Sequence, residues 1–160
     1  MSETASKPLQ PLKPLSIERV REYFDAQGWN YEDGSSPQSI RTGFAGMGLE
    51  VAYFAPNVAV TTSVAVDAIT ADRYEEVLAW AESYNNANAF PSVSAVKDPQ
   101  RNLAALGAVY SMPGFWEYTD IQFAAHLSSG IEGVLNASRD FLSHFAPEVL
   151  ARIDENAGRS

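Results

Sequence analysis

Residues 49–66 read LEVAYFAPNVAVTTSVAV, and this stretch decides the fold class. Apolar side chains, interrupted once by threonine, occupy every second position on both sides of Pro56 and Asn57, as expected for two strands that each bury one face. Pro56 and Asn57 are typical residues of a tight turn. The stretch therefore predicts an antiparallel β-hairpin. Its alternating residues are Leu49, Val51, Tyr53, Val58, Val60, Thr62, Val64 and Val66.

Helix signals lie on both sides of this hairpin. Ser16 is a capping residue that opens a first helix, and Gly28 ends it in a position where Trp29 folds back onto Phe24. A long third helix opens at the capping box TDIQ, residues 119–122, and continues to about Phe145. Pro147 ends it, and residues 148–156 are expected to add one short turn. Between the first and the third helix, a second helix is predicted from Thr70 onward.

A strand with alternating Ile40, Thr42 and Phe44 precedes the hairpin, and two further strands, at residues 90–96 and 103–112, complete the prediction. The order is helix, three strands, helix, two strands, helix. This order favours an α+β fold with a mainly antiparallel five-stranded sheet and flanking helices.

The end of the second helix reads WAESYNNANAFP, residues 80–91. On a continuing helix Asn88 would fall on the apolar stripe, so we expect the helix to end near Asn85 or Asn86, with asparagine in a left-handed exit. Asn85 lies at the edge of the stripe, where its amide is expected to bond the backbone at the helix–strand junction. The asparagines are interpreted as an exit device rather than as a catalytic site, because no base or nucleophile is tied to them by spacing.

The chain is expected to hold one domain with two tails. Residues 1–15 are a proline-rich tail, residues 16–156 a single domain and residues 157–160 a polar tail. The segment KPLQPLKPL, residues 7–15, has a proline at every third position, which matches one turn of polyproline II. It is either a stiff lead-in whose leucines touch the domain or a ligand for a proline-recognising module.

Composition excludes several classes of function. The formal net charge is −9 and no Lys/Arg cluster occurs, so nucleic acid and anionic membrane surfaces are disfavoured as partners. The chain has no cysteine, which excludes thiolate chemistry and cysteine-ligated metals. No apolar run approaches the ~20 residues that span a membrane, and the start has no signal-peptide pattern. We expect a cytoplasmic protein.

No catalytic motif is visible. The glycine-rich GFAGMG, residues 43–48, precedes a strand instead of a helix and lacks the lysine of a phosphate-binding loop. His126 and His144 are separated by about 27 Å along a continuous helix, which is too far for a shared metal. We therefore expect no catalytic residue, no cofactor-binding residue, no metal ligand and no enzymatic activity.

The second face of the predicted sheet is small and almost uncharged, whereas a solvated face usually carries Lys, Glu and Arg. We expect it to be covered, either by the third helix of the same chain or by a partner. Gly130 and Gly133 in that helix indicate close approach of another backbone, for which a second subunit is one hypothesis. The candidate partner surface comprises Ala59, Thr61, Ser63, Ala65, Ala104, Ala108, Gly130 and Gly133.

Several local sequences resemble the YbjN domain family, a family to which a regulatory role and a type III secretion chaperone-like fold are attributed. The resemblance rests on ERVREYFDAQGWNYE (residues 18–32), RYEEVLAWAESYNNAN (residues 73–88), ALGAVY (residues 105–110) and the TDIQ helix start, and covers about residues 16–145. The family-like positions are Gly28, Trp29, Trp80 and Asn85. The composition resembles that of actinobacterial members. The resemblance implies a compact domain, often dimeric, with no catalytic motif.

These observations favour a non-enzymatic protein-interaction module, chaperone-like or regulating sensory transduction, that forms a homodimer; a second, different protein is a further candidate partner. The alternative is a small-molecule sensor with a pocket lined by aromatic residues such as Tyr31, Trp80, Phe115 and Trp116.

Overall fold

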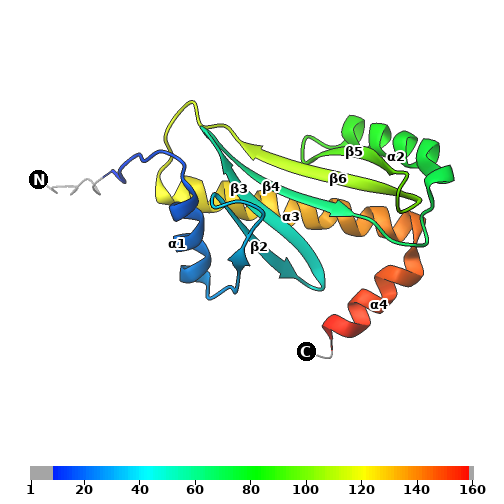
Figure 1. Cartoon of the computed structure of the whole chain (residues 1–160). Helices are drawn as coiled ribbons and strands as arrows, with labels where there is room; N and C mark the ends of the chain where they lie inside the picture. Colours follow the sequence, from blue (N-terminus) through cyan, green and yellow to red (C-terminus); the bar gives the residue numbers. More distant parts are fainter. Residues whose placement is uncertain (1–8, 159–160) are drawn as a thin grey trace, which may run out of the picture.

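The computed structural model describes residues 9–158, and within them it shows an α+β fold, as predicted (Figure 1). A six-stranded antiparallel sheet is accompanied by four α-helices. The helices are α1 (Ile17–Gln27), α2 (Tyr74–Ala87), α3 (Asp120–Phe145) and α4 (Pro147–Ala157). The strands are β1 (Glu32–Asp33), β2 (Ser39–Phe44), β3 (Met47–Phe54), β4 (Asn57–Val64), β5 (Ser92–Asp98) and β6 (Leu103–Met112).

The strand order across the sheet is β1-β2-β3-β4-β6-β5. The predicted hairpin is confirmed as the antiparallel pair β3 and β4, in which Val51 lies opposite Val60. A short 3-10 turn (Ala71–Arg73) and α2 then carry the chain from β4 to β5 at the sheet edge, and β6 returns between them. The sixth strand, β1, was not predicted, because two residues are too few to show alternation.

The predicted helix ends are largely confirmed. The Ser16 side chain accepts a hydrogen bond from the Arg19 N–H, and Gly28 adopts the left-handed conformation with φ 69°. The Trp29 N–H donates to the Phe24 carbonyl at 3.0 Å, and the two rings meet edge to face at 5.4 Å. At the start of α3, both hydrogen bonds of the predicted capping box are present.

The end of α2 differs from the prediction. The helix continues through Asn85 and Asn86 to Ala87, and Asn88 leaves it with φ −128° and ψ 134°, so the exit is extended rather than left-handed. The Asn88 side chain donates to the Tyr84 carbonyl at 3.0 Å, which caps the last turn. The helix was predicted to end because a further turn would bury Asn88 on the apolar stripe, and it does end before Asn88.

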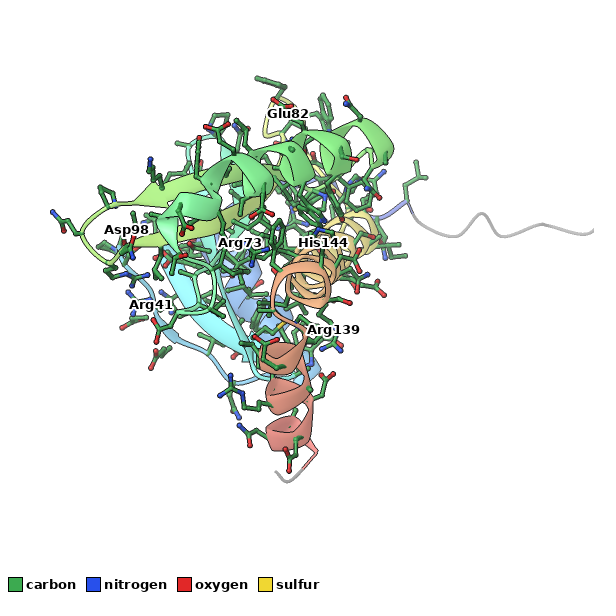
Figure 2. The ribbon with its side chains drawn as sticks, turned by 90° about the vertical axis from the view of Figure 1, so that its right-hand side faces the viewer. Arg41, Arg73, Glu82, Asp98, Arg139 and His144 are labelled. Atoms are coloured by element: carbon green, nitrogen blue, oxygen red, sulfur yellow. The ribbon has the colours of Figure 1, made fainter. Side chains whose placement is uncertain are left out.

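Three helices pack on one face of the sheet, which we call the inner face. Tyr23 of α1 contacts Phe123 of α3 with ring centroids 6.3 Å apart, and Trp80 of α2 contacts Phe141 of α3 at 5.5 Å. Figure 2 shows the arrangement from the side, with the strands to the left and α3, seen almost end-on, to the right. The hydrophobic core lies between these helices and the inner face.

The last helix is longer than expected. A single short turn was predicted for residues 148–156, but α4 has 11 residues. It projects from the end of α3 (Figure 1) and is tied back by Arg139, whose guanidinium bonds both carboxylate oxygens of Asp154 at 2.8 and 3.0 Å. The tip of the β2–β3 hairpin lies against it, because Gly46 contacts Ile153.

The described part of the N-terminal tail is attached to the domain. Lys13 pairs with Tyr118 through two backbone hydrogen bonds of 3.0 and 2.9 Å. The buried guanidinium of Arg19 donates to the carbonyls of Lys13 and Tyr118 at 2.8 and 3.2 Å. Leu15 is buried, whereas Leu9 and Leu12 are exposed. Pro8 lies outside the described residues.

Candidate interaction surface

The register between β4 and β6 determines which side chains share a face. Val60 lies opposite Tyr110, and Val64 lies opposite Leu106. Side chains alternate between faces along a strand, so the even-numbered residues of β6 face the helices with the core valines of β4. Ala59, Thr61 and Ser63 point to the opposite side.

This register corrects the predicted partner surface at two positions. Ala104 and Ala108 lie on the inner face and are fully buried in the core, so they cannot share a surface with Ala59 and Ser63. Ser63 lies opposite Gly107 instead. The prediction was wrong because the odd-numbered and the even-numbered residues of β6 are both apolar. Only the pairing with β4 decides which of the two sets is buried.

The expectation that the third helix covers the small-residue face is wrong for the residues of β4 and β5 and holds only for those of β6, Ala104 and Ala108, which lie on the inner face. α3 packs on the inner face, where Gly130 lies against the ring of Tyr110. A Cβ at Gly130 would stand 2.2 Å from the ring, and one at Gly133 would stand 3.1 Å from Phe90. Close approach explains both glycines as expected, but the neighbours are aromatic rings of the same chain.

We call the side away from the helices, along β4, β6 and β5, the outer face. Figure 1 views the sheet from this side, with α3 behind the strands. Asp98 is its single charged residue, and Arg101 neutralises it at 3.0 Å. Val96 and Val109 are 43% and 40% exposed there, whereas Ala59, Leu103 and Ala105 are buried within the single chain. The outer face comprises Asn57, Ala59, Thr61, Ser63, Ser92, Ser94, Val96, Asp98, Leu103, Ala105, Gly107, Val109 and Ser111.

The predicted Ala65 follows β4 directly and lies apart from this face. It lines a hollow of about 450 Å³ between the end of β4 and α4, together with Val66 and Ile153. Ala65 was predicted to belong to the partner surface, but the structure places it beside the outer face rather than within it.

A depression of about 800 Å³ adjoins the outer face over β1 to β4. Most of its lining residues have polar side chains, among them Arg41 and Glu50, which are separated by 3.6 Å. The Ser35 hydroxyl donates to Glu50 and lowers the pKa of that carboxyl. Tyr31 lies at the rim and donates to Asp25 at 2.9 Å, a hydrogen bond that raises the pKa of the phenol.

Asn85 protects the free edge of the sheet at β5. Its side chain accepts from the Val93 N–H at 2.9 Å and donates to the Val93 carbonyl at 2.8 Å, as a neighbouring strand would. The prediction that the Asn85 amide bonds the backbone at the helix–strand junction is therefore confirmed. Exposed edges invite unwanted strand pairing, and this contact closes part of the edge.

The aromatic residues considered for a sensor pocket do not line a common cavity. Tyr31 borders the depression on β1 to β4, and Trp80 packs between α2 and α3. Phe115 and Trp116 lie in the loop after β6 and are 81% and 56% exposed.

The two histidines take part in separate contacts. The ring of His126 bonds the hydroxyl of Tyr110 through Nδ1 at 3.0 Å, and His144 lies against Phe145. Within residues 9–158, no group of three or more His, Asp or Glu side chains is arranged to hold a metal ion. The same residues contain no helix that combines the length and apolarity needed to cross a membrane.

Comparison with known proteins gives a structural neighbour. No protein-family profile matches the chain, and no curated protein matches its sequence. A solved structure described as "YbjN, a putative transcription regulator from E. coli" is similar, with a TM-score of 0.66 and 14% sequence identity. The similarity covers 84% of this chain and 96% of that one. The fold of the chain is therefore YbjN-like.

Proposed function

We propose that this protein is a non-enzymatic interaction module, a divergent relative of YbjN, that self-associates through its outer face. The observation that carries the proposal is a sheet face that no helix within residues 9–158 covers, and on which the single charged residue, Asp98, is already paired. Burial of such a face removes little formal charge from water, so the charge contribution to the desolvation cost is low.

Net charge restricts where a second copy can dock. Each chain has a formal net charge of −9, so two copies that meet through an ordinary charged surface repel one another. The outer face is where they can approach without apposing carboxylates. Two packed sheets usually lie about 10 Å apart, and small side chains such as Ser63 and Ser94 allow the two faces to approach closely. A two-fold axis would present the same residues from both copies.

A regulatory role would then act through protein contacts. The structural neighbour is described as "a putative transcription regulator". A chain this acidic is a poor ligand for phosphate backbones, so we infer that regulation by this protein works by binding another protein rather than DNA. A cytoplasmic location fits this role.

The depression on β1 to β4 supports a second candidate function, a small-molecule sensor. Its volume of about 800 Å³ is in the range of ligand sites, and Arg41 and Glu50 offer a donor and an acceptor. A polar metabolite that raises the melting temperature of wild-type protein but not of an Arg41→Ala, Glu50→Ala variant would favour this function.

Matched charge variants test the proposed interface. Ser63→Glu with Val109→Glu places four carboxylates in the interface of a dimer, whereas Ser128→Glu with Ser129→Glu adds the same charge on exposed turns of α3. Light scattering on a sizing column should give dimers for the wild type and the α3 variant, and monomers for the outer-face variant. Circular dichroism verifies that each variant folds. A monomeric wild type at 200 µM, or a dimeric outer-face variant, would refute the proposal.

A further inference from the structure

A groove runs between the C-terminal half of α2 and the middle of α3, on the side of the molecule away from the outer face. It consists of two adjoining cavities of about 290 and 490 Å³ that share Tyr84, Asn88 and Asp140. The two helices are antiparallel here, because Trp80 contacts Phe141 while Phe90, beyond α2, contacts Gly133. The groove therefore collects side chains from the stretch WAESYNNANAFP and from one face of α3.

The walls of the groove combine aromatic faces with a carboxylate. Trp80 and Tyr84 stack with ring centroids 5.2 Å apart and an angle of 24° between their planes. Asp140 lines both cavities and has no ion-pair or hydrogen-bond partner among the described residues. Its negative charge acts on Tyr84, since burial first and Asp140 second raise the pKa of that phenol. Aromatic rings and a carboxylate both attract cations.

The remaining lining groups suit a planar cation with several donors. Asn88 and Asn136 place side-chain amides in the second cavity, and an amide oxygen accepts hydrogen bonds. The one cationic side chain in the lining, Arg139, is held by both carboxylate oxygens of Asp154 on α4, so its charge is neutralised. Figure 2 shows Arg139 close to α4.

We propose that this groove binds the guanidinium group of an arginine from a partner polypeptide. The guanidinium lies along the Trp80 and Tyr84 stack, forms a salt bridge with Asp140 and donates to the neighbouring amides. Lysine is a poorer occupant, because a point charge cannot satisfy a carboxylate and amides at fixed positions at once. The site is separate from the outer face, so it stands whether or not the chain self-associates.

Titration with Nα-acetyl-arginine amide tests the site, with Nα-acetyl-citrulline amide as the neutral control of the same shape. The readout is the indole N–H signal of Trp80 in ¹⁵N spectra, with Trp29 and Trp116 as internal references. We expect saturable shifts at Trp80 with the arginine compound, no saturation with citrulline, and weaker binding as salt increases.

Asp140→Asn should reduce the affinity at least five-fold, because it removes the charge and keeps the shape. Glu132→Gln, which alters another exposed carboxylate on α3 outside the groove, should leave the affinity unchanged. Both positions are exposed, so both variants are expected to fold, and a thermal melt verifies this. Equal shifts with arginine and citrulline, or unchanged affinity in Asp140→Asn, would overturn the proposal.

Discussion

Replacement of Asn85 by alanine should destabilise the protein although the side chain lies at the surface. The change removes the two hydrogen bonds to the Val93 backbone, of 2.9 and 2.8 Å. Each is worth about 0.5–1.5 kcal/mol net, and water can partly replace them, so we expect a loss of about 1–2 kcal/mol. Alanine has the higher helix propensity, which offsets a few tenths of a kcal/mol.

Asn86→Ala is the matched control. Asn86 is the neighbour of Asn85 in the same turn of α2, and it has no hydrogen bond to β5 among the described contacts. The control should change the free energy of unfolding by less than about 0.5 kcal/mol. Urea unfolding followed by tryptophan fluorescence gives both values, and hydrogen exchange of the Val93 amide reports the contact itself. If the two variants have the same stability and the Val93 amide stays equally protected, the edge-capping role of Asn85 is wrong.

Two further predictions concern α3. Gly130→Ala should lower the free energy of unfolding by about 1–3 kcal/mol, because the new methyl group meets the Tyr110 ring. Gly133→Ala should change it by less than about 1 kcal/mol. Thermal unfolding measures both values. The Arg139 guanidinium lowers the pKa of Asp154, so the ion pair stabilises the folded state above the ordinary pKa of aspartate and this contribution is lost as the pH falls below it. Melting temperatures between pH 6 and pH 2.5 should therefore decrease more steeply for wild type than for Asp154→Asn.

Short-range sequence patterns predicted several of the individual helices and strands correctly. The alternation in residues 49–66 identified β3 and β4, and the caps at Ser16 and Thr119 marked the starts of α1 and α3. Each of these signals depends on neighbours within a few residues, so the sequence contains all the information needed. The same holds for Asn85, whose partner Val93 is eight residues away.

Long-range pairing was the part that the sequence did not specify. β6 reads LAALGAVYSM, in which Leu103, Ala105 and Val109 on one side are as apolar as Ala104, Leu106 and Ala108 on the other. Alternation cannot choose the buried side of such a strand, and only the register with β4 does so.

α4 was underestimated for a different reason. Pro147 was interpreted only as the end of α3, but proline is also favoured in the first turn of a helix. Val149, Leu150 and Ile153 have the 3–4 spacing of an amphipathic helix and pack against the core. This signal was present in the sequence and was missed.

The central claim is that two copies meet through their outer faces, and the distance between spin labels tests it most directly. The chain has no cysteine, so Ser63→Cys on the outer face and Ser129→Cys on α3 can each be labelled singly. Packed sheets lie about 10 Å apart, so labels at residue 63 should give an inter-spin distance on the order of 20 Å, and labels at residue 129 a much longer one. A short distance at residue 129, or no dipolar interaction at residue 63 at high protein concentration, would contradict the account.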